Sequence, residues 1–325
     1  MQKSTIQLLR FHFSFFLLPV YLFALSRVVY TNWGHALLIF AILHLLVYPA
    51  SNGYNSYMDR DQTSIGGIKN PMAPTLELYI VTLLMDIISV GLSCIIGVWF
   101  ALGILLYILA SRAYSFRGIR LKKYPFVGYL TVVIFQGAVT YWLVYHGCHE
   151  PIEPITENIP VSGMLASSLL IGGFYPLTQV YQHEADAKDG VKSISSRLGY
   201  RGTFVFTAIV YSIAFMVLAW HFFVALDWNK FFVLATCMLP ILVYFFIWAR
   251  KVWKDTNEAS FSNTMKMNVL ASVCTNTGFL ILVIYDSNSM PRTIVGFSGV
   301  ATESQSPETN CCRAPFQPGN NSSFR

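Results

Sequence analysis

Long apolar runs separated by short polar segments dominate the first 286 residues of the chain. Nine of these runs are long enough, or nearly so, to cross a bilayer as helices of about 20 residues. They lie at about residues 11–30, 34–52, 77–96, 97–116, 125–146, 161–182, 203–225, 230–250 and 266–286. The third and fourth runs almost touch, so Gly97 is expected to form a tight turn between them. The pattern predicts an all-α, polytopic membrane protein with nine transmembrane helices.

The composition supports a membrane protein and excludes an ordinary soluble domain. Hydrophobic residues make up 54% of the chain and charged residues only 12%, which is far more apolar than soluble domains of this length. Residues 287–325 are instead polar, rich in Ser, Asn, Pro and Thr, and without apolar periodicity. We therefore expect one membrane domain at residues 1–286 and a disordered tail at residues 287–325.

The positive charges predict how the helices are oriented. The N-terminal segment and the connections after the second, fourth, sixth and eighth runs hold seventeen of the 22 lysines and arginines. Because cytoplasmic loops carry the excess of positive charge, these segments are expected to face the cytoplasm. The chain is thus predicted to be an integral multi-pass protein, of the cytoplasmic membrane if its source is bacterial.

One polar pattern occurs twice, each time where an apolar run ends. Residues 48–59 read Y-P-A-S-N-G-Y-N-S-Y-M-D, and residues 175–186 read Y-P-L-T-Q-V-Y-Q-H-E-A-D. On an α-helix, the two amides and the aspartate of each copy fall within an arc of about 60°. These residues are Asn52, Asn55 and Asp59 in the first copy and Gln179, Gln182 and Asp186 in the second. Each copy should present a polar stripe where a membrane helix meets the cytoplasm.

The two stripes carry oxygen ligands of the kind that Mg²⁺ prefers when it also binds phosphate. Asp189 extends the second stripe by a three-residue step, Asp61 follows the first copy in a loop-like segment, and Glu184 points to the opposite side. Between the copies lies a cationic segment able to neutralise a diphosphate, with Arg112, Arg117, Arg120, Lys122 and Lys123. A basic loop alone is mostly a topology signal, but the duplicated stripe favours a metal and diphosphate site on the cytoplasmic side.

Isolated polar residues inside the apolar runs are harder to interpret. Asp86 lies about nine residues into the third run and needs a partner there, either a substrate or a hydrogen-bonding group on a neighbouring helix. Four other lone polar residues are assigned no role: His12, His44, Gln136 and Asn276.

Three stretches of the sequence resemble the UbiA superfamily of intramembrane prenyltransferases. They are N-S-Y-M-D, Y-S-F-R-G-I-R-L-K and D-A-K-D-G-V-K-S-I-S-S-R-L-G, and the similarity covers roughly residues 8–286. The resemblance implies nine transmembrane helices around a central cavity, with two aspartate-rich motifs that bind Mg²⁺ and an isoprenyl diphosphate. Asn55 and Asp59 match the first motif. In the second, Gln182 replaces the first aspartate and Asp186 matches the other, so Asp189 or Glu184 would have to substitute.

The repeat and the resemblance together predict a Mg²⁺-dependent transferase of prenyl groups. It would move an isoprenyl group from a polyprenyl diphosphate to an aromatic or other lipophilic acceptor. The predicted catalytic residues and metal ligands are Asp59, Asp186 and Asp189, with Asn55 as a further metal ligand. The predicted diphosphate-binding residues are Asn52, Asn55, Arg120, Lys122, Gln179, Gln182, Tyr114 and Tyr181. The faces of Tyr54, Tyr114 and Tyr181 are expected to shelter an allylic cation.

Two alternatives remain open from the sequence. One is a non-catalytic relative that binds prenyl lipid, and the other is a membrane carrier of an anionic or phosphorylated solute. The expected partners of the chain are an isoprenyl diphosphate, a lipophilic acceptor and membrane lipid, and no nucleic acid is expected.

Overall fold

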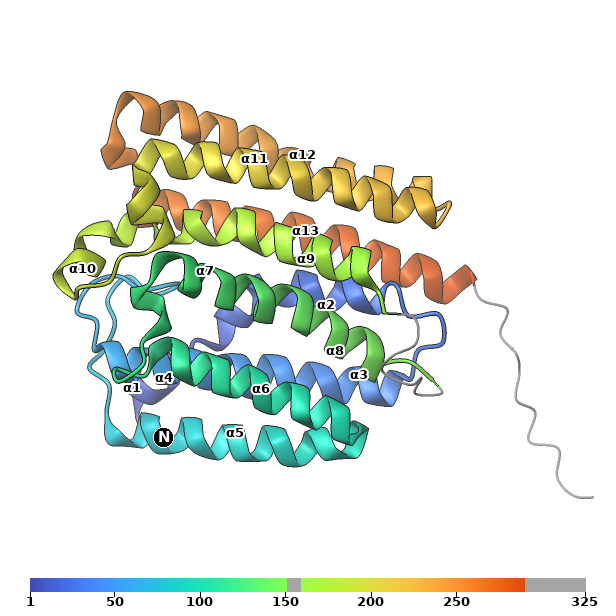
Figure 1. Ribbon diagram of the computed structural model, residues 1–325, viewed down its shortest axis with the longest axis horizontal. Helices are drawn as coiled ribbons and strands as arrows, with labels where there is room; N and C mark the ends of the chain where they lie inside the picture. Colours follow the sequence, from blue (N-terminus) through green and yellow to red (C-terminus); the bar gives the residue numbers. More distant parts are fainter. Residues whose placement is uncertain (151–158, 290–325) are drawn as a thin grey trace, which may run out of the picture. The chain divides into compact units, whose positions relative to one another are not determined.

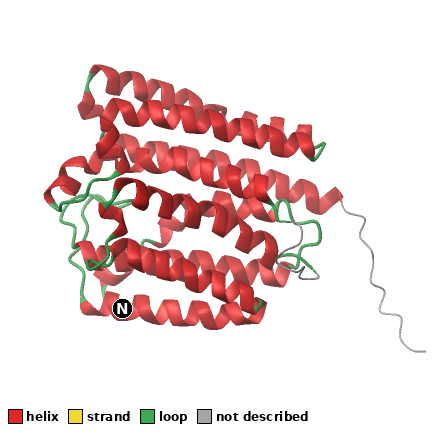
Figure 2. Ribbon diagram, in the orientation of Figure 1, coloured by secondary structure: helices red, strands yellow, loops and turns green. Residues whose placement is uncertain are grey.

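The described part of the chain is built from helices joined by short loops (Figures 1 and 2). The computed structural model describes residues 1–150 and 159–289, so the predicted tail lies outside the described residues from residue 290 onward. The helices in chain order are α1 (Lys3–Leu9), η1 (Phe11–Phe16), α2 (Leu18–Leu25), α3 (Trp33–Phe40), η2 (Ala41–Val47), α4 (Tyr48–Asp59), α5 (Leu76–Ile96), α6 (Val98–Ser115), η3 (Leu121–Lys123), α7 (Pro125–Val133), η4 (Ile134–Val139), α8 (Thr140–Gly147), α9 (Val161–Phe174), η5 (Tyr175–Gln182), α10 (His183–Lys188), α11 (Ile194–Val224), α12 (Trp228–Lys254), η6 (Thr256–Glu258) and α13 (Phe261–Ser289).

The predicted all-α membrane architecture is confirmed. Within the described residues, eight helices are long and apolar enough to cross a bilayer, and the number is nine if the bent pair at Lys3–Phe16 and Leu18–Leu25 counts as one span. Several spans join consecutive segments, as in Trp33–Asp59, which combines α3, the π-helical η2 and α4. Gly97 alone separates α5 from α6, as predicted.

The spans lie side by side, and their connections gather at two ends (Figure 1). The loops that follow α4, α6, α10 and α12 lie at the same end as the chain's N-terminus, at the left of Figure 1. The predicted cationic segments therefore share one end of the bundle. That this end faces the cytoplasm remains a prediction.

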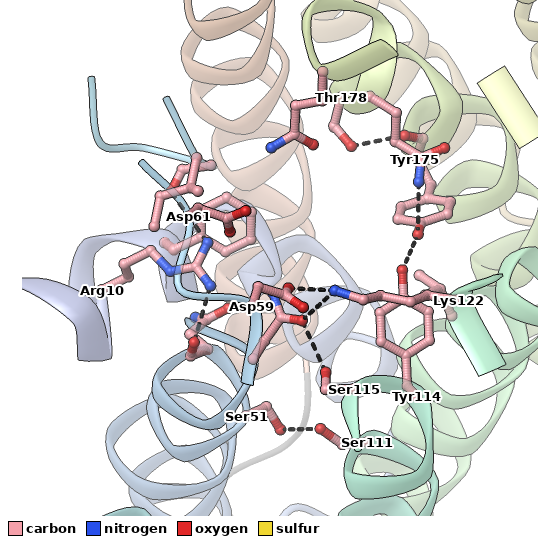
Figure 3. A pocket seen from close by; sticks show the side chains of 18 of the residues that line it. Arg10, Ser51, Asp59, Asp61, Ser111, Tyr114, Ser115, Lys122, Tyr175 and Thr178 are labelled. Carbon is pink, nitrogen blue, oxygen red and sulfur yellow. Dashed lines mark hydrogen bonds and ion pairs between the residues drawn. The ribbon is translucent and has the colours of Figure 1, made fainter. Parts of the chain in front are cut away.

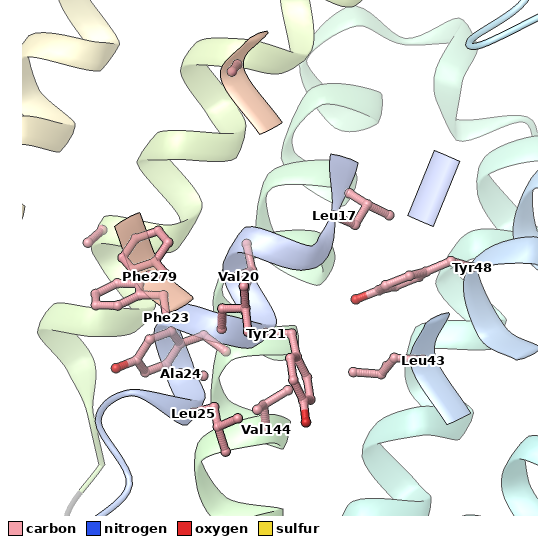
Figure 4. Packing of buried hydrophobic residues seen from close by; sticks show 14 of the residues in the cluster. Leu17, Val20, Tyr21, Phe23, Ala24, Leu25, Leu43, Tyr48, Val144 and Phe279 are labelled. Carbon is pink, nitrogen blue, oxygen red and sulfur yellow. The ribbon is translucent and has the colours of Figure 1, made fainter. Parts of the chain in front are cut away.

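Aromatic packing around α2 holds the middle of the bundle together (Figure 4). The Phe23 ring stacks on Phe279 of α13 with centroids 4.8 Å apart and meets Tyr141 of α8 edge-on at 5.0 Å. All three side chains are fully buried. In a bilayer, close packing rather than exclusion of water drives the association of helices. These contacts hold the first, fifth and last spans against one another.

The two copies of the repeated pattern fold differently. The first forms the regular α-helix α4, as predicted, whereas the second begins as the 3-10 helix η5 and becomes α-helical only at His183. The prediction of an α-helical arc for the second copy was therefore wrong. Its polar face survives nonetheless, because residues three apart, such as Gln179 and Gln182, eclipse one another on a 3-10 helix.

Candidate functional site

The two polar copies line one cavity, which lies at the end of the bundle that carries the N-terminus (Figure 3). The cavity measures about 230 Å³ and is lined by residues from the first span, α4, α6, η4, η5, α10 and α13. Its lining includes the predicted site residues Asn52, Asn55, Asp59, Tyr114, Lys122, Gln179, Tyr181, Gln182, Asp186 and Asp189. Of the residues predicted to be catalytic, metal-binding or diphosphate-binding, all except Arg120 line this cavity, and Arg120 instead contacts two of the lining aspartates, Asp59 and Asp189.

Asp59 lies at the centre of the ionic contacts of the site. Its side chain is 3% exposed and forms an ion pair with Lys122, which comes from the loop after α6 (Figure 3). The Oδ1 atom of Asp59 lies 3.7 Å from an Arg120 nitrogen and has no hydrogen-bond partner. Because a buried carboxylate is costly without nearby cations, these two side chains compensate for the burial of Asp59.

The second copy brings carboxylates to the same cations. Asp189 forms an ion pair with Arg120 and approaches Arg117 at 3.8 Å, while Asp186 lines the cavity from α10. Arg120 therefore bridges the aspartates of the two copies. Glu184 is exposed and does not line the cavity, so the structure does not bring it together with the other predicted carboxylates.

Asp61 supplies a fourth carboxylate, which the sequence placed only in a loop. It lines the cavity from the segment that follows α4. Burial raises the pKa of Asp61 to about 6, and the charge of Asp59 adds to the increase. The loop is fastened to the second copy because Gln182 Nε2 donates to the Ser64 carbonyl at 3.5 Å. Gln182 thus anchors the loop that carries Asp61.

The other amides of the two copies are only partly satisfied. Asn55 Oδ1 accepts hydrogen bonds from the Ser115 hydroxyl at 2.8 Å and from Lys122 Nζ at 3.3 Å. By contrast, Asn52 Nδ2 and Gln179 Oε1 are buried and lack a hydrogen-bond partner. Buried polar atoms without partners are rare in folded proteins, so their presence in a cavity suits a ligand that offers both donors and acceptors.

Arg10 is a site residue that the sequence analysis missed by treating it as a topology signal. It is 6% exposed, lines the cavity, and donates to the Asn52 carbonyl at 3.0 Å and to the Gly66 carbonyl at 3.4 Å. Its Nε atom has no hydrogen-bond partner. The sequence did contain an indication of this role. Arg10 stands between the apolar residues Leu9 and Phe11, where a charge requires partners.

Tyrosines line the part of the cavity next to these charges. The hydroxyls of Tyr114 and Tyr175 hydrogen-bond to each other, and Gln179 Nε2 donates to the Tyr175 hydroxyl at 2.9 Å. Tyr181 also lines the cavity. The expectation for Tyr54 was wrong: its ring lies 3.9 Å beneath the Arg112 guanidinium and does not line the cavity.

Arg112 belongs to a separate structural pair, contrary to its expected role as a diphosphate cation. It forms an ion pair with Asp86 of α5, donates to the Thr82 carbonyl at 3.2 Å, and its side chain is 14% exposed. Of the two readings for Asp86, the structure supports the bond to a neighbouring helix. Lys123 is exposed and does not line the cavity, so Lys122 is the lysine of this segment that reaches the site.

The donor set suits a magnesium ion that arrives with a phosphate-bearing ligand. Among the described residues, no three carboxylate, histidine or cysteine side chains stand close enough to form a complete metal cage. Four aspartates nevertheless line the cavity: Asp59, Asp61, Asp186 and Asp189. In addition, Asp59 Oδ1 and Gln179 Oε1 accept no hydrogen bond. Mg²⁺ commonly takes one or two carboxylates and completes its shell with water and substrate phosphate, which fits this arrangement.

Comparison with known proteins agrees with this architecture. The sequence model of the UbiA prenyltransferase family matches residues 13–270. Among curated proteins, no sequence gives a significant match.

Several solved structures share the fold. A UbiA homologue from Archaeoglobus fulgidus, bound to DMAPP and Mg²⁺, is 19% identical with a TM-score of 0.63, and covers 87% of this chain and 99% of its own. The apo UbiA homologue from Aeropyrum pernix K1 is 17% identical with a TM-score of 0.63, and covers 84% of this chain and 98% of its own. A digeranylgeranylglyceryl phosphate synthase is 17% identical with a TM-score of 0.57, over 88% of this chain and 98% of its own.

Proposed function

Because this chain belongs to the UbiA prenyltransferase family, it is a membrane prenyltransferase, and we propose that its cavity binds an isoprenyl diphosphate together with Mg²⁺. The observation that carries the proposal is the meeting of Asp59 from one polar copy with Asp186 and Asp189 from the other, beside Arg10 and Lys122. The homologue from Archaeoglobus fulgidus was solved with GPP and Mg²⁺ and with DMAPP and Mg²⁺, which supports the same ligands here.

The aspartates would hold the metal. Asp59, Asp61, Asp186 and Asp189 offer hard oxygen ligands, and the amide of Gln179 offers another. When bound, Mg²⁺ neutralises charge on the diphosphate and stabilises it as a leaving group. Asn55 remains a predicted metal ligand, although its Oδ1 atom already accepts from Ser115 and Lys122.

The cations would hold the diphosphate itself. Lys122 and Arg10 line the cavity, and Arg120 lies 3.7 Å from Asp59 Oδ1. When the bond between the prenyl carbon and the diphosphate oxygen breaks, the electron pair stays on the diphosphate. Fixed cations stabilise that developing charge without having to reorganise.

The tyrosines would lie next to the prenyl carbon, on which positive charge develops as the bond to the diphosphate breaks. Loss of diphosphate leaves an allylic cation, which aromatic faces stabilise through their negative quadrupole. Tyr114 and Tyr181 line the cavity next to the charged residues and are suited to this role. The acceptor then forms a bond to the same carbon and loses a proton.

The proposal is tested with purified full-length protein, geranyl diphosphate and MgCl₂. We expect diphosphate release that depends on Mg²⁺ and stops when a chelator is added. Mass spectrometry after adding an extract of the native membrane lipids should detect a prenylated product. A protein that binds geranyl diphosphate but never releases diphosphate would be a non-catalytic prenyl-lipid binder, and a carrier would release intact solute.

A further inference from the structure

A second cavity lies between α11 and α12, which run side by side at the top of Figure 1. It measures about 270 Å³ and shares no lining residue with the candidate site. One residue of α13, Met267, forms its floor. The lining from the other two helices includes Ala208, Tyr211 and Phe215 of α11 and Ile241 and Phe246 of α12.

The lining of this cavity suits a hydrocarbon chain. The Thr207 hydroxyl already donates to the Gly173 carbonyl at 2.8 Å. The Ser212 hydroxyl donates to the Ala208 carbonyl at 2.9 Å. The Tyr211 ring packs so closely on Gly173 of α9 that a methyl group there would come within 2.5 Å of it. The other lining residues are apolar, so the cavity provides packing surface for a chain and few groups for a polar ligand.

The open side of the cavity faces the surroundings of the bundle. Ser212 and Phe246, which line the cavity from the two helices, are both exposed. Ile209 of α11 and Val243 of α12 do not line it and are exposed as well. Exposed apolar side chains on membrane-spanning helices contact lipid tails, so a tail can enter the cavity directly from the bilayer.

Two arginines lie on the same helix faces, nearer to the end of the bundle that carries the N-terminus. Arg201 precedes Ala208 by seven residues, which is nearly two turns, and stands about 10 Å from it along α11. Arg250 follows Phe246 by four residues, about one turn, and stands about 6 Å from it along α12. Both cations therefore border the groove where the hydrocarbon of the bilayer gives way to its head groups.

Neither arginine is neutralised by the protein. Both are exposed, and within the described part of the chain neither pairs with a carboxylate. Arg201 Nη2 donates to the Trp253 carbonyl at 2.8 Å, which ties the start of α11 to the end of α12. The remaining N–H groups of both guanidinium ions are available to phosphate oxygens.

We propose that the groove between α11 and α12 binds an anionic phospholipid, with one acyl chain in the cavity and the phosphate on Arg201 and Arg250. Basic residues between membrane helices attract lipids with a net negative head group. A zwitterionic lipid gains less, because its own ammonium group already lies beside the phosphate. The cavity and the two arginines thus recognise the two halves of one molecule.

Two lipids with the same chains test the head group: dioleoylphosphatidylglycerol and dioleoylphosphatidylcholine. Each is titrated into the purified full-length protein in the same detergent, and native mass spectrometry gives the Kd. We expect phosphatidylglycerol to bind at least about fivefold more tightly. Glycerol 3-phosphate, which has the phosphate but no chains, should not displace it. Equal Kd values for the two lipids, or displacement by glycerol 3-phosphate, would contradict the proposal.

Arg250→Gln and Arg201→Gln test the cations. Each should raise the Kd for phosphatidylglycerol about fivefold and leave the Kd for phosphatidylcholine unchanged, because one cation near the head group is lost. The matched control is Lys123→Gln, which removes an exposed cation from the loop after α6 and should change neither Kd. A preference for phosphatidylglycerol that stays undiminished in both arginine variants would place the head group elsewhere and overturn the inference.

Ala208→Phe tests the cavity by filling it. The Kd for both lipids should rise at least about threefold, because the acyl chain loses its packing contacts. Ile209→Phe is the matched control, since it adds the same ring to the adjacent, lipid-facing position outside the cavity and should leave both values unchanged. If Ala208→Phe does not fold, Ser212→Phe at the edge of the same cavity takes its place. A folded cavity variant that binds both lipids as the control does would overturn the inference.

Discussion

Lys122 forms an ion pair with Asp59, and this contact ties the loop after α6 to the end of α4. The lysine Nζ atom also donates to Asn55 Oδ1 at 3.3 Å. Lys122 therefore contacts both Asp59 and Asn55, the two residues of the first polar copy that were predicted to be metal ligands. Arg120 makes the corresponding bridge, 3.7 Å from Asp59 and paired with Asp189. These contacts of Lys122 and Arg120 therefore link both copies of the pattern to the cationic loop.

Asp59→Asn and Asp186→Asn should each lower kcat/KM for geranyl diphosphate at least about a hundredfold, because asparagine keeps the shape but removes the charge that Mg²⁺ requires. The loss of a shared ion makes such changes non-additive, so the double variant should be scarcely worse than either single one. Steady-state kinetics of the three variants check this. Near-normal Mg²⁺-dependent transfer in both single variants would refute the proposed site.

Variants of Asp61 and Glu184 test which of these two carboxylates replaces the aspartate that is missing at position 182. Asp61 lines the cavity and Glu184 is exposed, so Asp61→Asn should weaken Mg²⁺-dependent binding of geranyl diphosphate about tenfold, while Glu184→Gln should leave it nearly unchanged. Titration calorimetry at fixed geranyl diphosphate measures both. The reverse order of effects would show that Glu184 is the substitute.

Asp61 should also make the metal-free protein less stable at neutral pH. Burial raises the pKa of its carboxyl from 3.8 to about 6, so between these values the folded state binds more protons than the unfolded state. The resulting penalty is complete above about pH 6 and is relieved as the pH falls toward 4. Asp61→Asn should therefore raise the melting temperature at about pH 7.5 and change it little at about pH 4. Thermal unfolding in detergent with a chelator measures the difference, and an equal gain at both pH values would contradict this assignment.

The pair of Arg112 and Asp86 should matter for stability more than for binding. Asp86→Asn leaves the Arg112 guanidinium, 14% exposed, without its counter-ion, at a cost of about 3 kcal/mol. The matched control Lys123→Ala removes an exposed cation from the following loop and should change stability by less than about 0.5 kcal/mol. Thermal unfolding of both variants, alongside the Kd for geranyl diphosphate, checks the distinction. A specific loss of binding in Asp86→Asn at unchanged stability would place Arg112 in the site instead.

The orientation of the bundle can be tested in intact cells. Cysteines replacing Lys69, in the loop after α4, and Leu226, in the loop between α11 and α12, are exposed at opposite ends. The charge distribution predicts that Lys69 is cytoplasmic and Leu226 external, so an impermeant thiol reagent should label only the second. Labelling of the cysteine at position 69 alone would show that the bundle has the opposite orientation.

The sequence by itself determined the spans and much of the site. Apolar length is a local property set by bilayer thickness, which is why the nine runs and the turn at Gly97 agree with the helices. The repeated pattern likewise fixed which residues stand at the ends of the second and sixth spans. The predicted site residues come together because both of those ends lie on the same side of the bundle.

Only the tertiary structure decided which partner each polar group has. Arg10 and Arg112 look alike in the sequence, as basic residues at the edge of apolar runs, yet one lines the cavity and the other pairs with Asp86. That Asp61 lines the cavity and Glu184 does not depends on the course of the loop after α4, which Gln182 contacts through the Ser64 carbonyl. These differences arise from contacts between distant segments, because the neighbour of a polar residue inside a helical bundle is set by the packing of helices and not by its own place in the chain.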